Sequence, residues 1–343
     1  MASYDFLFDN TGLRDWCSQA AEAKTTSMAD LLAKTKGEEV SVSVWDFPFP
    51  SLDALNESCR KIPETRDLTR GLENGFLSIK DALRFVLDPI TEPLSWMLDG
   101  ALYVADNAPW WIIIPLLLAL TLWVSRSWKL VGSVAASIMG LAFIDHYQYA
   151  IQTLAIIFVC ASICVVFGVP IGIAMSRSDR FQRISLPILD LLQTLPTFVY
   201  LIPLIFLFSV TESKLYGIAI IMYAIVPVIR LTDLGIRMVD KDVLEAAQAF
   251  GMTPQQKLIK VQIPLALPNI MAGINQTIMM SLAMVVIASL VSAPGLGVLV
   301  LRGIRSLELG VGLVAGLGIV VLAVILDRVT KSALARVNTA QDQ

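Results

Sequence analysis

The chain has 343 residues, of which 56% are hydrophobic and 16% are charged, and its mean hydropathy is +0.69. A soluble domain usually carries about 25% charged residues. The apolar residues also gather into long runs that a soluble core would not need. The composition therefore excludes an ordinary soluble globular protein and predicts an all-α integral membrane protein.

The net charge of −3 hides an asymmetry along the chain. Residues 1–108 contain 10 Lys/Arg and 18 Asp/Glu, a net charge of −8, and the remaining residues have a net charge of +5. An acidic N-terminal region thus precedes a mildly basic membrane region. We expect membrane lipid around the latter and no nucleic-acid partner.

Residues 1–75 carry the Pro and Gly punctuation of loops and short helices, and we expect this acidic tail to be extracytoplasmic. The first 16 residues lack a basic segment followed by an apolar one, so we expect no signal peptide. Cys17 and Cys59 could pair if the tail is extracytoplasmic, although their spacing specifies nothing. Cys160 and Cys164 lie in an apolar run, where free cysteines usually serve as packing residues.

Residues 76–108 show an amphipathic pattern, in which Phe76, Ile79 and Leu83 recur at helical spacing. We expect a break at Pro89 and Pro93, and acidic residues interrupt the apolar face, so this region should not span the bilayer. Interfacial helices lying on the membrane are favoured. The alternative is a small soluble helix packed on the tail.

Seven apolar segments follow and predict about seven transmembrane helices. Several are shorter than the ~20 residues that a bilayer core requires. Two G-x-x-x-G spacings, Gly168/Gly172 and Gly312/Gly316, would let helix backbones approach closely. The segments are residues 110–124, 130–144, 149–175, 196–210, 215–229, 268–292 and 311–326.

Basic residues predict the topology of these segments. Lys and Arg gather after the first, third, fifth and seventh segments, whereas the loops 145–148 and 211–214 are nearly free of basic charge. Arg302 and Arg305, after the sixth segment, are the exception. The distribution predicts an N-terminus outside, a C-terminus in the cytoplasm and a cytoplasmic location for residues 245–268.

The sequence has no phosphate-binding P-loop and one histidine, His146, which we interpret as a solvated loop residue. We expect no catalytic residue, no metal site and no cofactor on this chain. The apolar segments also carry almost none of the buried charges that a secondary transporter uses to couple ions. An energy source on another chain is therefore favoured over a self-sufficient carrier or channel.

Uncharged polar residues interrupt the sixth apolar segment. Such groups cost free energy in lipid and should face protein or a water-filled path. They could line a translocation path, or they could form interhelical hydrogen bonds beside flexible Met packing. The aromatic side chains could meet a cation or simply pack. The candidate path residues are Asn275, Gln276, Thr277, Met280, Ser281, Phe198 and Tyr200.

A polar stretch between the fifth and sixth segments contains EAAQAFGMTPQQKLIKVQIP. Asp240 or Asp242 can cap a first helix, and Gly251 fits the C′ position that ends it. Thr253 then begins a second helix in a T-x-x-Q capping box, and Pro264 is expected to end it. We call residues 240–264 the hairpin; its alanine-rich surface suits docking into a groove of another protein.

The hairpin resembles a motif of permease subunits of binding-protein-dependent ABC importers: E-A-A, three residues, G, nine residues and I-x-L-P. Over residues 110–330 the chain is more closely similar to the glycine betaine/proline (ProW-type) osmoprotectant permeases, in PILDLLQTLPTFVYLIP, GINQTIMMSLAMVVIASLVSAPGLG, VLRGI and ILDR. PGLG at residues 294–297 departs from the usual Gly-Gly-Leu-Gly. The matching motif residues are Glu245, Ala246, Ala247, Gly251, Val261, Ile263 and Pro264, with Val for Ile and Ile for Leu.

This resemblance implies a type I ABC transmembrane core at residues 146–330, two accessory helices within 109–145 and a cytoplasmic tail at 331–343. Two permease copies would form the path in the bacterial inner membrane. Two ATPase subunits, which use ATP and Mg, would dock at Glu245–Gly251, and an external substrate-binding protein would dock on the other side. The implied cargo is glycine betaine, proline betaine, choline, carnitine or trimethylamine N-oxide, and the permease sequence does not say which.

Overall fold

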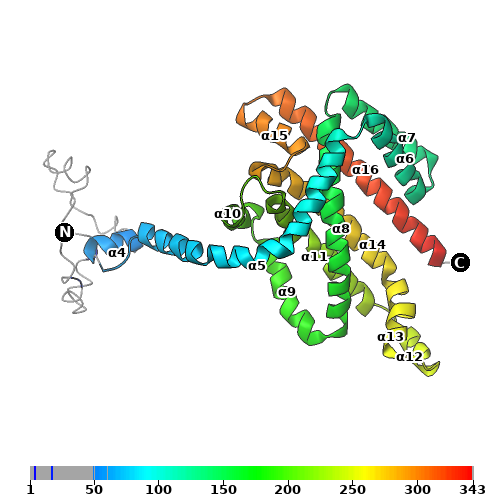
Figure 1. The fold of residues 1–343 in the computed structure, drawn as a ribbon. Coiled ribbons are helices and arrows are strands. Elements are labelled where there is room, and N and C mark those ends of the chain that lie inside the picture. Colours follow the sequence, from blue (N-terminus) through cyan, green and yellow to red (C-terminus); the bar gives the residue numbers. More distant parts are fainter. Residues whose placement is uncertain (1–3, 5–16, 18–48, 50, 60, 342–343) are drawn as a thin grey trace. The chain divides into compact units, whose positions relative to one another are not determined.

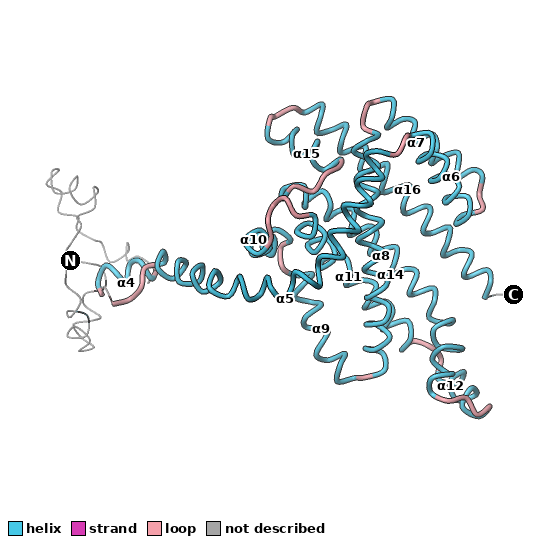
Figure 2. The backbone as a smooth tube through the Cα atoms, in the orientation of Figure 1, coloured by secondary structure: helices cyan, strands magenta, loops and turns pink. Residues whose placement is uncertain are grey.

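The computed structural model describes Tyr4, Cys17, Phe49 and residues 51–59 and 61–341. Within these residues all regular structure is helical and no strand occurs (Figure 2), which confirms the all-α prediction. The chain divides into two compact units, residues 1–83 and 84–343.

The first unit holds α4 (Leu52–Ser58) and the beginning of α5 (Thr65–Asn107). Cys59, directly after α4, forms a disulfide with Cys17. Both cysteines are buried in a small cluster with Tyr4, against which Leu55 packs. The pairing that the sequence left open is therefore formed.

Helix α5 runs without interruption from Thr65 to Asn107, so the predicted break at Pro89 and Pro93 is wrong. A proline inside a helix removes one backbone hydrogen bond and its ring crowds the preceding turn. Both prolines lie on the exposed side of α5, whereas Leu94 and Leu98 on the other side are buried. Packing of that buried side keeps the helix continuous.

Each of the seven predicted apolar segments lies largely within a helix, although residues 208–210 at the end of the fourth segment fall outside one. In the described part of the chain, four helical stretches are each long and apolar enough to cross a membrane: 147–177, 213–237, 254–291 and 309–336. The number rises to six if two bent pairs each count as one span: α5 with α6, bent by 118°, and α9 with α10, bent by 95°. The helices after α5 are α6 (Trp110–Ser125), α7 (Trp128–Phe143), α8 (Tyr147–Arg177), α9 (Asp179–Thr194), α10 (Thr197–Leu207), α11 (Ser213–Arg237), α12 (Lys241–Ala249), α13 (Pro254–Lys257), η2 (Leu258–Gln262), α14 (Ile263–Ala288), η3 (Ser289–Val291), α15 (Leu296–Arg305) and α16 (Leu309–Gln341).

Helix α11 packs against α8 and α14 at the centre of the second unit (Figure 1). A Cβ atom at Gly172 of α8 would clash with Thr232 of α11, and one at Gly168 would clash with Val228. The predicted close approach at Gly168 and Gly172 is thus confirmed. Gly312 likewise lies against Gly303 of α15, but the space beside Gly316 is open.

Helix α15 follows the sixth apolar segment and was not among the predicted helices. Its N-cap is Gly295, whose φ of +114° favours glycine. The hydroxyl of Thr153 in α8 accepts a hydrogen bond from the buried backbone N–H of Leu296 at 2.9 Å. A side chain more than a hundred residues away therefore caps this helix.

Candidate functional site

The first helix of the hairpin, α12, begins at an aspartate cap. The carboxylate of Asp240 accepts a hydrogen bond from the backbone N–H of Asp242 at 2.9 Å. Of the two aspartates that the sequence offered, Asp240 is thus the N-cap, and Asp242 lies in the first turn. There its negative charge interacts favourably with the positive end of the helix dipole.

Gly251 ends α12 with a φ of +77°, as predicted for the C′ position. The N–H of Gly251 donates to the carbonyl of Gln248 at 2.9 Å, and the N–H of Met252 donates to the carbonyl of Ala247 at 3.2 Å. These two bonds make a Schellman motif. A Cβ atom at Gly251 would meet nothing within 4 Å, so the backbone conformation alone explains the preference for glycine.

The second helical segment begins with the predicted capping box. Thr253 accepts from the N–H of Gln256 at 3.3 Å, and the Gln256 side chain accepts from the N–H of Thr253 at 3.0 Å. Pro254 occupies the first turn, where its missing N–H costs little.

The expectation that Pro264 ends this segment is wrong. After α13 the chain continues as a π-helical turn, η2, and then directly as α14, in which Pro264 lies in the first turn. In that turn the N–H of Ile263 reaches back to the carbonyl of Leu258. A π turn uses i→i+5 bonds, so it changes the hydrogen-bond register just before the proline and the helix can proceed.

The hairpin is attached to the core by apolar side chains of its second half. Leu258 is buried and Ile263 is half-buried in a cluster with Ile236 of α11 and Ala266 and Ile270 of α14. Val261, also in the motif, is half-buried. These residues position the hairpin between the end of α11 and the beginning of α14.

The first half of the hairpin is largely exposed. Helix α12 makes its main contacts with α13 and η2. Helices α12 and α13 lie at one end of the second unit (Figure 1). Glu245, Ala246 and Gly251 are exposed, and Ala247 is buried. Pro264, at the start of α14, is exposed. The motif therefore contains outward-facing residues that a partner can reach and inward-facing residues that hold the hairpin.

Phe250 lies within the predicted docking range 245–251 but is not one of the motif residues, and it is 85% exposed. Val243, Ala247 and Phe250 follow i, i+4, i+7 spacing, which is typical of one apolar helix face. Of the three, only Ala247 is buried by this chain. This spacing could have identified Phe250 from the sequence. Val243 and Phe250 form an apolar edge of α12 that this chain leaves uncovered.

An ion cluster anchors the end of α11 just before the hairpin. The Arg237 guanidinium donates to Asp233 at 2.9 Å, to Asp179 of α9 at 2.7 Å and to the carbonyl of Met175 of α8 at 2.8 Å. Asp233 is buried and also accepts from Gln182 of α9 at 2.6 Å. Three helices therefore meet at the point where the hairpin begins.

Two of the predicted path residues, Asn275 and Tyr200, form contacts between helices, and Ser281 forms a bond within α14. Asn275 donates to Asp327 of α16 at 3.2 Å and accepts from Thr330. Ser281 and Tyr200 are buried, and their hydroxyls donate to the Thr277 carbonyl at 2.8 Å and to the Met284 sulfur at 3.7 Å.

The other predicted path residues are spread between the interior and the surface. Thr277 is buried, Met280 is half-buried, and Gln276 and Phe198 are exposed. The predicted residues thus differ widely in exposure, and the lining role stays a prediction.

In the described part of the chain, no three or more His, Cys, Asp or Glu residues are grouped so that they could hold a metal ion. His146 lies at the N-cap of α8, where it is half-buried and its Nδ1 contacts the carbonyl of Ile144. The interpretation of His146 as a solvated loop residue is therefore only partly right.

Comparison with known proteins gives consistent matches. Residues 165–338 match the family model described as binding-protein-dependent transport system inner membrane component. The chain is 37% identical to the glycine betaine/proline betaine transport system permease protein ProW of Escherichia coli, over 97% of this chain and 92% of the relative. It is 42% identical to the glycine betaine/carnitine transport permease protein GbuB of Listeria monocytogenes, over 71% of this chain and 87% of the relative.

A more distant relative and a solved structure also match parts of the chain. The chain is 35% identical to the trimethylamine N-oxide transport system permease protein TmoV of Ruegeria pomeroyi, over 65% of this chain but 34% of the relative. An inward-facing structure of the MetNI methionine ABC transporter has a TM-score of 0.51 at 20% identity, over 56% of this chain and 95% of that one. At this identity the structural match supports the fold alone.

Proposed function

The chain belongs to the family of binding-protein-dependent transport system inner membrane components, and from this premise we propose that it is the permease subunit through which an ATP-driven importer moves a small methylated ammonium solute. The observation that carries the proposal is the hairpin. It is a capped, exposed helix–turn–helix attached directly to α11 and α14.

The driving partner is a separate ATPase subunit that uses ATP and Mg and receives α12 in a groove. The exposed Glu245 and Ala246 and the uncovered apolar edge of α12 support this docking. Helix-in-groove contacts are commonly built from such a face. The complete transporter holds two permease copies, two ATPases and an external substrate-binding protein.

The solute is a quaternary or tertiary ammonium compound or an amine oxide. Support comes from the relatives, whose names give glycine betaine, proline betaine, carnitine and trimethylamine N-oxide. Choline has the same trimethylated ammonium group. The shared feature is a small methylated nitrogen, which aromatic side chains of a binding protein can hold by cation–π contacts.

The N-terminus lies outside the cytoplasm and the hairpin lies inside it. The distribution of basic residues supports this orientation. The Cys17–Cys59 disulfide supports it independently, because disulfides persist in oxidising compartments and are rare in the cytosol.

The proposal is tested with Glu245→Lys in the complete transporter reconstituted in proteoliposomes. A reversed charge on the docking face should lower ATP-dependent glycine betaine uptake by at least about tenfold, a coupling loss of about 1.4 kcal/mol or more. It should also reduce co-purification of the ATPase while the amount of permease in the membrane is unchanged. Glu73→Lys, at an exposed acid of α5, is the matched control and should leave uptake unchanged.

Normal uptake and normal ATPase retention in Glu245→Lys would contradict docking at this face. The alternative class, a self-sufficient secondary carrier, makes a separate prediction. Vesicles that contain this chain alone would then accumulate solute under an ion gradient without ATP. We expect no accumulation there, and its observation would reject the ATP-driven proposal.

A further inference from the structure

Residues 84–107 of α5, which we call the brace segment, contact the beginnings of two core helices. At one end of the segment, Asp106 accepts hydrogen bonds from the side chains of Gln148 and Gln152 of α8, each at 2.8 Å. The Gln148 amide also donates to the carbonyl of Ala105 at 3.0 Å. The first turns of α8 are thereby bound to the end of α5.

The middle of the brace segment contacts the first turns of α11. Leu98 is fully buried, and Leu94 is nearly so. Both lie against Gly217, where any Cβ atom would clash with the Leu98 side chain. The Ser213 hydroxyl donates to the carboxylate of Asp99. Apolar packing and a hydrogen bond therefore join the same two helices.

The beginning of the brace segment takes part in an ion cluster centred on Lys214. The Lys214 side chain is 5% exposed, and its ammonium lies 2.7 Å from Asp88, 3.1 Å from Glu212 and 3.4 Å from Glu92. Arg84 completes the cluster, at 3.1 Å from Asp88 and 2.7 Å from Glu212. We call these five residues the Lys214 cluster.

A buried lysine is rarely found without partners, because removing its charge from water is costly. Here carboxylates from α5 and from the turn before α11 compensate that cost, and the Phe208 ring lies 5.3 Å from the ammonium. The ammonium is thus satisfied only while α5, the turn and α11 keep this arrangement. Lys214 accordingly makes the position of α5 depend on that of α11.

Helix α11 connects this cluster to the hairpin. Its 25 residues run from Ser213 to Arg237, and α12 begins at Lys241. At a rise of 1.5 Å per residue, the length of α11 is roughly 38 Å. One continuous helix therefore links the hairpin to the brace segment.

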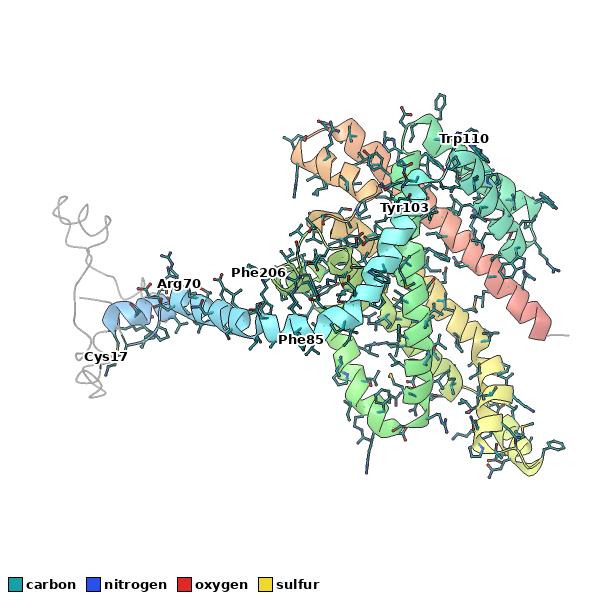
Figure 3. The ribbon with its side chains drawn as sticks, in the orientation of Figure 1. Cys17, Arg70, Phe85, Tyr103, Trp110 and Phe206 are labelled. Atoms are coloured by element: carbon teal, nitrogen blue, oxygen red, sulfur yellow. A yellow bond between two sulfur atoms is a disulfide. The ribbon has the colours of Figure 1, made fainter. Side chains whose placement is uncertain are left out.

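We propose that the brace segment makes the beginnings of α8 and α11 move as one body during transport, with Lys214 as the positioning residue. The proposal rests on the function proposed above. The opposite side of the segment, which includes Phe85 and Tyr103, 82% and 70% exposed, takes no part in it (Figure 3). A brace of this kind keeps a movement received at the hairpin from being lost as independent motion of α11.

The first test compares Lys214→Met with Lys214→Arg in the reconstituted transporter. Lys214→Met keeps most of the length of the side chain but removes its charge, so the solute imported per ATP hydrolysed should fall by about fivefold or more. Lys214→Arg should retain most of this ratio. Arg302→Gln removes an exposed ion pair with Glu308 and is the control that should change nothing. An unchanged ratio in Lys214→Met would overturn the proposal.

The second test keeps Lys214 and replaces the Asp99–Ser213 hydrogen bond with a disulfide, in the double variant Asp99→Cys/Ser213→Cys. A brace does not open during transport, so uptake should persist when the disulfide is closed. Combined with Lys214→Met, the closed disulfide should restore the lost ratio, and reductant should remove the rescue. Wild type treated with the same reductant controls for the Cys17–Cys59 disulfide.

If closing the disulfide stops uptake, α5 and α11 must separate during transport, and the brace is rejected. If the Lys214→Met protein fails to reach the membrane, the double-cysteine variant that retains Lys214 decides between the two outcomes. Failure of the proposed function would look different, because the unmodified transporter would then show no ATP-dependent uptake at all.

Discussion

The hairpin that follows α11 and the beginning of α11 are held in different ways. Beyond Arg237 the chain enters a hairpin whose turns are fixed by backbone caps between residues at most five positions apart. At the other end, Lys214 is held by carboxylates of α5 more than a hundred residues earlier in the sequence. Contacts between nearby residues thus determine the turns of the hairpin, which presents an exposed surface. The Lys214 cluster, by contrast, forms only when distant helices pack together.

This difference has a functional meaning. A docking element must keep its shape while its surface stays free for a partner, and local caps achieve that without burying the helix. An element that transmits movement must instead be tied to several helices at once. Substitutions in the hairpin, at its junction with the core and in the packed core separate these two kinds of structure, and they follow in order of decreasing effect.

Gly251→Pro should have the largest effect. Proline cannot reach a φ of +77° and removes the N–H that donates to Gln248, so the turn should lose about 3 kcal/mol or more. Uptake in the reconstituted transporter should become undetectable while the permease still reaches the membrane. Gly251→Asn, which tolerates the left-handed conformation, should retain most of the uptake. Equal loss in both variants would mean that the backbone conformation is not what matters.

Arg237→Met should destabilise the junction between the core and the hairpin by about 3 kcal/mol, because it leaves the buried Asp233 carboxylate without its ion pair. A lower thermal unfolding temperature of the purified protein in detergent is the measurement. Arg70→Met removes an exposed pair with Asp67 and should cost at most about 1 kcal/mol. Similar shifts for the two variants would show that burial at Asp233 has no energetic weight.

Thr153→Val should cost about 1–3 kcal/mol, since the buried N–H of Leu296 loses its acceptor without a replacement. Thr153→Ser keeps the hydroxyl and should be close to wild type in the same unfolding experiment. If valine and serine behaved alike, the contact between α8 and α15 would be packing rather than a hydrogen bond.

Thr253→Ala should have the smallest effect, about 1 kcal/mol, because it removes one half of a capping box at an exposed position. Hydrogen exchange followed by mass spectrometry should show faster exchange in residues 253–257 and unchanged exchange in α11. Faster exchange that spread into α11 would contradict the local character of the hairpin.

Elements that depend on neighbouring residues could be predicted from the sequence. Apolar runs marked the helices, Thr253 and Gln256 specified the capping box, and Gly251 specified the end of α12, because each depends on neighbours within a few residues. The motif around Glu245 could be read for the same reason.

Other features depend on packing between distant helices and could not be predicted. This packing kept α5 continuous through Pro89 and Pro93, capped α15 with Thr153 and buried Lys214 among carboxylates. Each outcome depends on which distant helix lies alongside, and neither local propensity nor hydrophobic periodicity carries that information. Packing energy can outweigh a local preference of a few kcal/mol, and in this chain it does so where α5 meets α8 and α11.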